Sequence, residues 1–387
     1  MIARHTTPIL LKNARVVLAD EVAESLALLI EDGAIRAFDP AALPAGTVEH
    51  DLQGKCLLPG LIDLHCDALE KEVEPRPGVH FPLAFACAQA DRRNAMAGIT
   101  TVFHALSFAN EELGVRSNTF AAEIARFCTE HADDFLVENR IHTRYEVTDA
   151  SAVSELLQLM DAHATHLISF MDHSPGQGQF ADIDAYRNYL QRTYKTDAAS
   201  LDALLERKQA DAAQSSERIQ QLAEHARKHQ LVMAGHDDDS REKVQRMHGF
   251  GTTISEFPTN LEAAQTACDL GMATLFGAPN ILRGQSQSGN MKALDAVNHG
   301  VAVCLCSDYA PATLLPAVLR LPELADITLP QAVAMVTRHP AAAAGLHDRG
   351  EIAIGKRANL IAIDCHAATP LPTDVWVGGQ QVLSIRG

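Results

Sequence analysis

The sequence predicts an α/β fold, a (β/α)₈ barrel of the TIM type with a small β-sandwich domain formed by both termini. Two observations predict it. Residues 59–349 alternate apolar, strand-like runs with helical stretches, which is the pattern of repeated βα units. Residues 8–58 and 350–387 instead carry short strands with alternating polarity and glycine-containing turns. We therefore expect residues 1–58 and 350–387 to form the two parts of the sandwich, and residues 59–349 to form the barrel.

The two terminal segments are predicted from their short-period patterns. In the first, the runs ILLKNARVVLA and SLALLIEDGAIRAFD are strand candidates, and Asp32-Gly33 is a hairpin signal. In the last, GEIAIGKRANLIAID and VWVGGQQVLSIRG alternate apolar and polar residues around glycine-rich turns. Two β-rich ends that flank one long α/β segment are best explained if they meet in one small domain.

Eight apolar runs of the middle segment are strand candidates, and eight is the number that a (β/α)₈ barrel requires. They are LIDLH, TTVFHAL, RIHTRYEV, HLISFMD, LVMAGH, TTISEF, ATLFGA and VAVCLCSD. Helices are predicted between them, for example SAVSELLQLMDAHA and SERIQQLAEHARKHQ, which has apolar residues at helical spacing. The polar, charged insert at residues 176–215 is predicted to be mostly helical and to act as a lid or an oligomer contact.

Composition excludes several classes of protein. The chain has 387 residues, and its formal net charge of −17 argues against general nucleic-acid binding. It contains no apolar run long enough for a membrane helix and no signal-peptide pattern, so we predict a cytoplasmic protein. The eight cysteines are scattered without a CxxC pair, which indicates reduced thiols rather than a disulfide framework.

Candidate metal ligands follow several of the predicted strands. Catalytic groups of such barrels gather at the carboxyl ends of the strands. The candidates are His65 and Asp67 on the first strand, Glu146 on the third, His173 after the fourth, His236 after the fifth and Asp308 after the last. His65 and Asp67 are two positions apart, so they point to one side of a strand. The same spacing relates His142, Arg144 and Glu146. Any one of these residues alone would usually be structural, but six in the same setting indicate a metal site. The aspartates at 237–239 fit either a solvated loop or a helix N-cap.

This ligand set indicates hydrolytic chemistry. Imidazole and carboxylate ligands together suit zinc, manganese, iron or nickel. A bridging carboxylate allows two such ions to lie about 3.5 to 4 Å apart and to activate a shared water as the nucleophile. Asp308 is the natural group to bind the metal or to take the proton of that water. We therefore expect divalent metal ions, two in number.

The chain resembles the amidohydrolase superfamily over almost its entire length. The motifs are LLPGLIDLH, a late SD, HPAAAAGLHDRGEIAIGKRANLIAID and a closing VWVGGQQV. Longer segments are similar to the PhnM family of the carbon-phosphorus lyase pathway, whose members are α-D-ribose 1-methylphosphonate 5-triphosphate diphosphatases. These segments are HCDALEKEVEPRPGV, MDHSPGQGQF, GHDDDS, EFPTN, GAPNILRGQSQSGN and SDYAPATLL. The resemblance implies a barrel with a β-sandwich made from both termini.

The resemblance also implies roles for individual residues. His65 and Asp67 correspond to the first-strand pair of metal ligands, with Asp67 where many relatives have a second histidine. Glu146 stands where the superfamily has its bridging residue, often a carboxylated lysine. The remaining correspondences are His173 and His236 with the two later metal histidines, and Asp308 with the last-strand acid.

A triphosphate substrate needs donors as well as metals. Arginine suits bidentate phosphate contacts, and loops of small residues allow backbone N–H groups to come close. The segments EKEVEPRPG and GAPNILRGQSQSGN have these features. The candidates for substrate binding are Lys71, Arg76, Arg144, Arg283 and Asn290, with Ser286, Ser288, Gly289 and Lys292 in the same loop as Arg283.

The expected function is hydrolysis between the α and β phosphates of α-D-ribose 1-methylphosphonate 5-triphosphate, which releases diphosphate. The partner would be a phosphorylated sugar, with no nucleic acid and no membrane, and a homo-oligomer is left open. The alternative enzyme is a cyclic-amide hydrolase or deaminase on the same barrel, whose pocket would lack several of the Arg and Lys contacts. A non-catalytic relative would have lost ligands at several strand ends, which is not observed.

Overall fold

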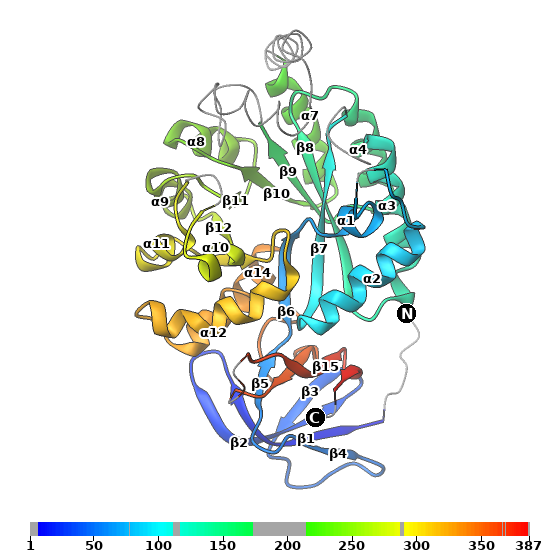
Figure 1. Ribbon diagram of the computed structural model, residues 1–387, viewed down its shortest axis with the longest axis vertical. Helices are drawn as coiled ribbons and strands as arrows, with labels where there is room; N and C mark the ends of the chain where they lie inside the picture. Colours follow the sequence, from blue (N-terminus) through cyan, green and yellow to red (C-terminus); the bar gives the residue numbers. More distant parts are fainter. Residues whose placement is uncertain are drawn as a thin grey trace.

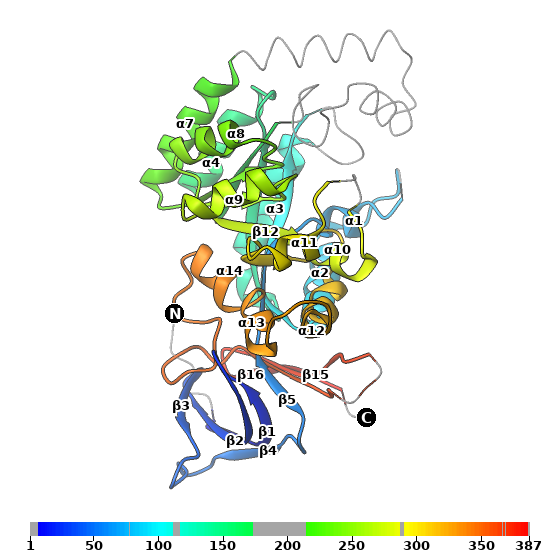
Figure 2. The same cartoon turned by 90° about the vertical axis from the view of Figure 1, so that its left-hand side faces the viewer.

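A computed structural model describes residues 7–76, 78–110, 117–172, 214–286, 290–365, 367 and 369–385. They form two sheets of eight strands each (Figure 1). One is a parallel sheet in strict chain order, and the other is a mixed sheet built from both ends of the chain. The predicted fold class is confirmed, because the parallel sheet curls into a nearly closed barrel and the terminal sheet forms a separate unit beside it (Figure 2).

The parallel strands coincide with the eight predicted runs. They are β6 (Leu61–Cys66), β7 (Ile99–Phe108), β8 (Glu138–Glu146), β9 (Leu167–Met171), β10 (Val232–His236), β11 (Ile254–Glu256), β12 (Ala273–Gly277) and β13 (Cys304–Cys306). Each pairs in parallel with its neighbour in the chain. Strands covered on both faces read as continuous apolar runs, and all ten residues of β7 are buried.

Helices cover the outside of the barrel. Those before β11 are α1 (Leu69–Val73), α2 (Leu83–Met96), α3 (Asn118–Glu130), α4 (Ala152–Asp161), α7 (Ser215–Lys228) and α8 (Arg241–Gly249). Those after it are α9 (Leu261–Asp269), α10 (Ala278–Arg283), α11 (Ala293–Asn298), α12 (Leu314–Leu324), α13 (Leu329–Ala334) and α14 (Arg338–Ala343). In the part of the chain that the structure describes, short 3₁₀ helices lie at Ala132–Asp134 and Pro311–Thr313. Side-chain caps begin α8 and α9, because Ser240 accepts from the N–H of Lys243 and Asn260 from that of Ala263.

The terminal sheet joins segments from the two ends of the chain. Its strands are β1 (Ile9–Val17), β2 (Val22–Glu31), β3 (Ala34–Phe38), β4 (Val48–Asp51), β5 (Cys56–Pro59), β14 (Leu360–Ile363), β15 (Pro372–Val377) and β16 (Gln380–Ser384). β14 pairs antiparallel with β5, which links the two ends. The predicted hairpin turn lies between β2 and β3, where Asp32 and Gly33 both adopt positive φ. Leu11, Leu28 and Trp376 belong to a core of its own.

One expectation about the cysteines is wrong. The structure pairs Cys56, on β5, with Cys365, just after β14, in a disulfide that joins positions 309 residues apart. The other six cysteines are free, as predicted, and five of them are buried. The sequence could not indicate this pair, because the two cysteines become neighbours only when the ends of the chain meet in one sheet.

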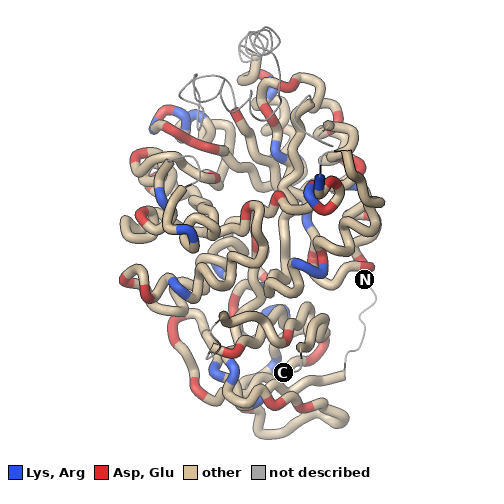
Figure 3. The backbone as a smooth tube through the Cα atoms, viewed as in Figure 1, with Lys and Arg blue, Asp and Glu red and all other residues tan. Residues whose placement is uncertain are grey.

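Two further predictions concern the insert and the charge of the chain. Residues 176–213 of the predicted insert lie outside the described residues, and α7 begins at Ser215. Lys and Arg positions lie scattered among Asp and Glu positions along the backbone (Figure 3). Within the described ranges, no helix is both long and apolar enough to cross a membrane.

Candidate metal centre and active site

The barrel closes between its first and last strands, and the closing hydrogen bonds lie among the predicted site residues. The N–H of Asp308 donates to the carbonyl of His65 at 2.9 Å, and the N–H of Asp67 donates to the carbonyl of Asp308 at 3.0 Å. The carboxylate of Asp63 accepts from the N–H groups of His65 and Ser307, at 3.2 and 3.1 Å. This seam therefore holds His65, Asp67 and Asp308 side by side.

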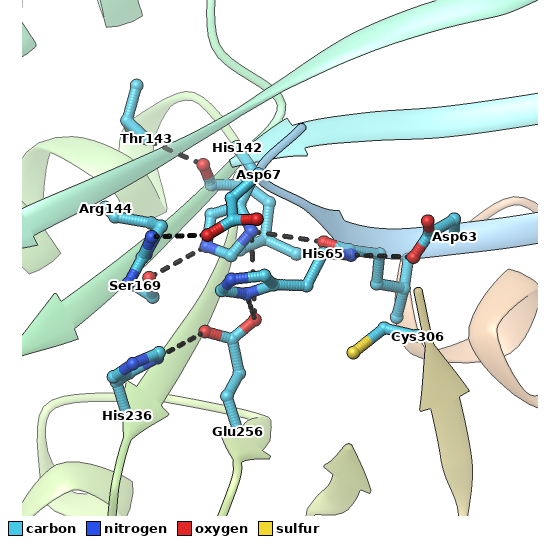
Figure 4. A network of polar contacts seen from close by, with 12 residues as sticks. Asp63, His65, Asp67, His142, Thr143, Arg144, Ser169, His236, Glu256 and Cys306 are labelled. Atoms are coloured by element: carbon cyan, nitrogen blue, oxygen red, sulfur yellow. Dashed lines mark hydrogen bonds and ion pairs between the residues drawn. The ribbon is translucent and has the colours of Figure 1, made fainter. Parts of the chain in front are cut away.

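A buried carboxylate, Glu256 at the end of β11, connects two of the predicted histidines. Nδ1 of His65 lies 3.2 Å from its Oε1, and Nδ1 of His236 lies 3.1 Å from its Oε2. Figure 4 shows both rings pointing at this carboxylate. Because an ionised carboxylate only accepts hydrogen bonds, each Nδ1 carries the hydrogen and each Nε2 keeps a lone pair. This is the arrangement in which a carboxylate orients metal-binding imidazoles.

These imidazoles are neutral near pH 7. Burial, and then the nearby Arg144 cation, lower the pKa of His65 to about 3. Burial also lowers the pKa of His236 to about 3. Phe257 contributes to the burial, since its ring packs edge-on against both imidazoles, with centroid distances of 4.9 and 5.4 Å. Neutral imidazole is the form that binds metals, so no proton competes with an ion here.

A third histidine, His142 on β8, supports the cluster from one side. The sequence analysis predicted no role for His142. Its Nδ1–H donates to the carbonyl of Leu64 at 3.1 Å, and its Nε2 lies 2.8 Å from the hydroxyl of Ser169. Its ring meets that of His65 edge-on, with centroids 5.1 Å apart. With both nitrogens engaged, His142 fixes the position of the His65 ring.

The donor set fits a divalent transition-metal ion. One nitrogen or oxygen atom from each of His65, His236 and Glu256 lies within 4.8 Å of the other two. Because Glu256 holds the Nδ1–H groups, the two imidazoles would bind an ion through Nε2. Oδ1 of Asp67 is buried without a hydrogen-bond partner, although its Oδ2 lies 3.9 Å from Nη1 of Arg144. Nitrogen and carboxylate ligands together suit zinc and its neighbours in the first transition row. A buried carboxylate oxygen without a donor is a position that a cation would stabilise.

Asp308 lies at the edge of this group, at the end of β13. Burial, and then the neighbouring Asp67 carboxylate, raise the pKa of Asp308 to about 7. Its backbone φ is 54°, in the left-handed region that few residues other than glycine, asparagine and aspartate adopt. A carboxyl group that titrates near neutrality can exchange a proton with a substrate or a water.

Of the other two predicted ligands, Glu146 is among the described residues and His173 is not. Glu146 is buried at the end of β8, as the sequence predicts, and accepts a hydrogen bond from the Thr148 hydroxyl at 3.0 Å. It does not belong to the group formed by His65, His236 and Glu256. His173 lies outside the described residues. The bridging role of Glu146 and the ligand role of His173 stay predictions.

The aspartates after His236 lie in a mostly buried segment rather than in a solvated loop. Asp237 and Asp238 are both buried, and Asp238 accepts from the hydroxyl of Ser255 at 2.5 Å. The N-cap of α8 is Ser240, so the aspartates are not the cap either. The ammonium of Lys243 is buried beneath this segment and donates to the carbonyls of His236 and Asp237, at 3.1 and 3.0 Å.

Two of the predicted substrate-binding cations meet above the site. Lys71 on α1 and Arg283 on α10 both contact Tyr309, the residue after Asp308. Nζ of Lys71 lies 5.7 Å from the centroid of the Tyr309 ring, and Nη1 of Arg283 lies 3.4 Å from its hydroxyl. Both cations are exposed. Segments that follow three different strands thus place two positive charges against Tyr309, the residue next to Asp308 in the chain.

The remaining substrate-binding candidates lie in different places. Arg144 is largely buried and points toward Asp67 from β8 (Figure 4). Arg76 is exposed in a turn that its backbone forms with Val79, and Asn290 is partly buried after α10. Among the described residues, neither Arg76 nor Asn290 makes a hydrogen bond or ion pair with the site residues named above.

Glu256 is the main residue that the sequence analysis missed. It is the last residue but one of TTISEF, one of the eight predicted strands, and the rule that selected the other candidates would have selected it too. The signal was weak because a single glutamate followed by phenylalanine has no second ligand beside it. Its partners His65 and His236 are 191 and 20 residues away in the chain.

Comparisons with known proteins agree with this geometry. The profile of the amidohydrolase family matches residues 56–382. The α-D-ribose 1-methylphosphonate 5-triphosphate diphosphatase of Escherichia coli (strain K12) is 38% identical over 359 residues, which cover 91% of this chain and 94% of that protein. The imidazolonepropionase of Deinococcus deserti is 24% identical, over 93% of this chain and 92% of that protein.

Solved structures share the fold. N-isopropylammelide isopropylaminohydrolase from Burkholderia multivorans superimposes with a TM-score of 0.68 at 17% identity, covering 98% of this chain and 99% of that one. N-acetylglucosamine-6-phosphate deacetylase from Pasteurella multocida superimposes with a TM-score of 0.64 at 14% identity, covering 97% and 99%. At such identities these likenesses concern the fold alone.

Proposed function

The chain belongs to the amidohydrolase family, and on this premise we propose that it is a metal-dependent hydrolase that cleaves α-D-ribose 1-methylphosphonate 5-triphosphate to the 5-phosphate and diphosphate. The similarity to the Escherichia coli diphosphatase covers 91% of this chain and 94% of that protein. The reaction would serve phosphonate catabolism. A cytoplasmic location and an oligomeric state stay predictions.

One observation of the site carries the proposal: Lys71 and Arg283 meet at Tyr309, directly beside Asp308. A triphosphate brings several negative charges, and cleavage moves further charge onto the leaving diphosphate. Two cations held by one aromatic side chain at the mouth of the barrel suit that charge. The neighbouring histidine and carboxylate cluster lies at the same carboxyl-terminal edge of the strands, where barrel enzymes perform their chemistry.

The proposed metal ligands are His65, His236, Asp67 and Glu146, together with His173 and Asp308. A divalent ion bound there would polarise a phosphoryl oxygen and favour ionisation of the attacking water. Glu256 orients the two imidazoles, and His142 fixes the position of His65. The number and identity of the ions are part of the proposal, with two ions and zinc as our first choice, and manganese, iron or nickel as the others.

The chain's own groups then perform the hydrolysis. Asp308 accepts a proton from the attacking water as the water oxygen bonds to the α-phosphorus. The bond between the α-phosphorus and the bridging oxygen breaks, and diphosphate leaves with that oxygen. Lys71 and Arg283 neutralise the charge that develops on the diphosphate. Arg144 offers a further cation deeper in the site, where it can contact the phosphoryl group under attack.

The alternative is a cyclic-amide hydrolase or deaminase, and the similarity to an imidazolonepropionase favours it to a limited degree. That similarity is 24%, whereas the diphosphatase is 38% identical over a comparable length. A neutral cyclic amide would also leave Lys71 and Arg283 without an anionic partner. We therefore prefer the phosphorylated substrate.

The test removes the phosphate contacts without touching the proposed ligands. Arg283→Ala should keep its metals and folding transition while losing roughly 2 to 4 kcal/mol in kcat/KM, about 30-fold to 1000-fold. Arg283→Lys should recover only part of this loss, because lysine cannot make the bidentate contact. Tyr309→Phe should lose less than Arg283→Ala, since it removes only the hydroxyl that contacts Arg283.

The matched control is Arg246→Ala, which removes an exposed arginine from α8. It should leave kcat/KM unchanged. If Arg283→Ala also retains kcat/KM within about threefold of the parent, then Arg283 only packs on the surface and its role in phosphate binding must be abandoned.

A further inference from the structure

A second group of metal-ligating side chains lies on the outer layer of the barrel. The helix α4 ends at Asp161, α7 carries His225 in its last turn, and His229 is the C-cap of α7. His225 and His229 are four positions apart, so their side chains lie on the same face of the helix. α4 and α7 pack side by side (Figures 1 and 2), which brings the three residues together.

Both imidazoles face one carboxylate oxygen. Nε2 of His225 lies 2.8 Å from Oδ1 of Asp161, and Nε2 of His229 lies 3.2 Å from the same atom. One ligand atom from each of the three residues lies within 4.8 Å of the other two. The histidine side chains are 23% and 20% exposed, so packing restricts their rings, whereas Asp161 is 63% exposed and leaves a route from solvent.

A third imidazole lies beside this group. His163 follows α4 by two residues, in a turn where its own φ is 53°. Its ring meets that of His229 edge-on, with centroids 5.5 Å apart, and the rings of His225 and His229 are 4.9 Å apart. His163 therefore lies next to the group of three through its contact with His229, although it is not among the residues whose ligand atoms all lie within 4.8 Å of one another.

We propose that Asp161, His225 and His229 bind a divalent transition-metal ion, zinc above all, with His163 as the fourth ligand. Zinc in closed sites takes four nitrogen, sulfur or carboxylate ligands in a tetrahedron, which this set can supply. Binding requires each histidine to present a nitrogen lone pair in place of the hydrogen that Asp161 accepts. The ion then replaces these hydrogen bonds with bonds to all three side chains.

The proposed site is separate from the catalytic one. α4 and α7 lead into β9 and β10, so their C-terminal ends lie at the amino-terminal side of the barrel strands, whereas the catalytic groups follow the carboxyl ends. An ion at this position would tie α4 to α7, and α7 immediately precedes the strand that carries His236. Its role would be to stabilise this side of the barrel, and it does not depend on the substrate proposed above.

The experiment counts zinc in the full-length, metal-loaded protein. The double variant His225→Gln/His229→Gln keeps polar groups at both positions but removes two imidazole ligands. After equilibration with zinc chloride and removal of free zinc, elemental analysis should find one zinc fewer in this variant than in the parent. His248→Gln is the matched control, since it replaces an exposed histidine of the neighbouring helix α8, and its zinc content should equal that of the parent.

Thermal unfolding gives an independent readout. Excess zinc should raise the apparent Tm of the parent and of His248→Gln by about 2 to 4 °C more than that of the double variant, because a ligand stabilises the state that binds it. Turnover of the double variant should equal that of the parent, so a failure here leaves the proposed hydrolysis untouched. His163→Gln should bind the same zinc more weakly.

Equal zinc content in the parent and the double variant would overturn the proposal, and the cluster would then be only a hydrogen-bonded group of two histidines with Asp161. An equal rise in Tm for both proteins would overturn it too. If His163→Gln binds zinc as tightly as the parent, then His163 is not a ligand.

Discussion

Replacement of Glu256 by glutamine should weaken metal binding without changing the shape of the site. The carboxylate accepts from Nδ1 of both His65 and His236, at 3.2 and 3.1 Å, and is completely buried. A carboxamide of the same size offers one oxygen as an acceptor and one NH₂ group as a donor. One of the two imidazoles must then accept at Nδ1, which places its hydrogen on Nε2 and removes the lone pair that binds the ion.

The magnitude follows from the number of rings affected. Loss of a carboxylate that orients a metal-binding histidine typically costs about 10-fold to 100-fold in metal affinity. Only one of the two rings loses its orientation, so we expect a loss in this range, about 1.4 to 2.7 kcal/mol. Glu256→Asp retains the charge but shortens the reach, and it should fall between the parent and Glu256→Gln.

The assay is a competitive titration of the metal-free protein with zinc and a chromophoric chelator. It is best performed with the His225→Gln/His229→Gln background, so that the proposed outer site does not contribute. The control is Glu262→Gln, which changes an exposed carboxylate on α9 that pairs only at the surface with Arg241. If Glu256→Gln binds zinc within about threefold of the parent, Glu256 does not orient the imidazoles and the proposed ligand geometry is wrong.

Three further predictions concern proton transfer, metal content and pH. Asp308→Asn should fold and yet lose at least about a hundredfold in turnover, as measured by steady-state kinetics, and near-normal turnover would remove Asp308 from the mechanism. Glu146→Ala should contain less metal by elemental analysis if Glu146 bridges two ions, whereas an unchanged content would exclude the bridge. His166 accepts the N–H of Ile141 at Nδ1, and burial lowers its pKa from 6.5 to about 4. Because the unfolded chain binds that proton more readily, the contribution of His166 to stability is complete above pH 6.5 and is lost as the pH falls toward 4. In denaturant unfolding of the metal-free protein, His166→Gln should reduce the fall in unfolding free energy between these pH values by up to roughly 3 kcal/mol, and an equal fall in both proteins would contradict this.

The fold was predictable because its strands have a simple sequence signal. A parallel strand covered by helices on one side and by the barrel interior on the other is buried along its length, so β7 appears in the sequence as TTVFHAL, a run without Asp, Glu, Lys or Arg. That β5 pairs with β14 was predictable only because both ends of the chain carry short strands with alternating polarity. The disulfide between Cys56 and Cys365 was not predictable, since it depends on the register of that pairing.

A site residue was predictable where the sequence at the end of a single strand is sufficient to identify it. His65 and Asp67 are two positions apart at the end of β6, so the sequence alone could place them together. Glu256 and His142 were missed because their roles depend on partners from other strands, which only the closed barrel brings close. For the same reason the contact of Lys71 and Arg283 with Tyr309 could not be inferred, since the three residues follow different strands.

The most direct test of the central claim is phosphorus NMR of the purified, metal-loaded protein with α-D-ribose 1-methylphosphonate 5-triphosphate. Water attack at the α-phosphorus should produce diphosphate and the ribose 5-phosphate in equal amounts, with no orthophosphate at early times. The Asp308→Asn variant provides the background rate. Release of orthophosphate as the first product, or a substrate spectrum that stays unchanged while the protein hydrolyses a cyclic amide, would contradict the proposed function.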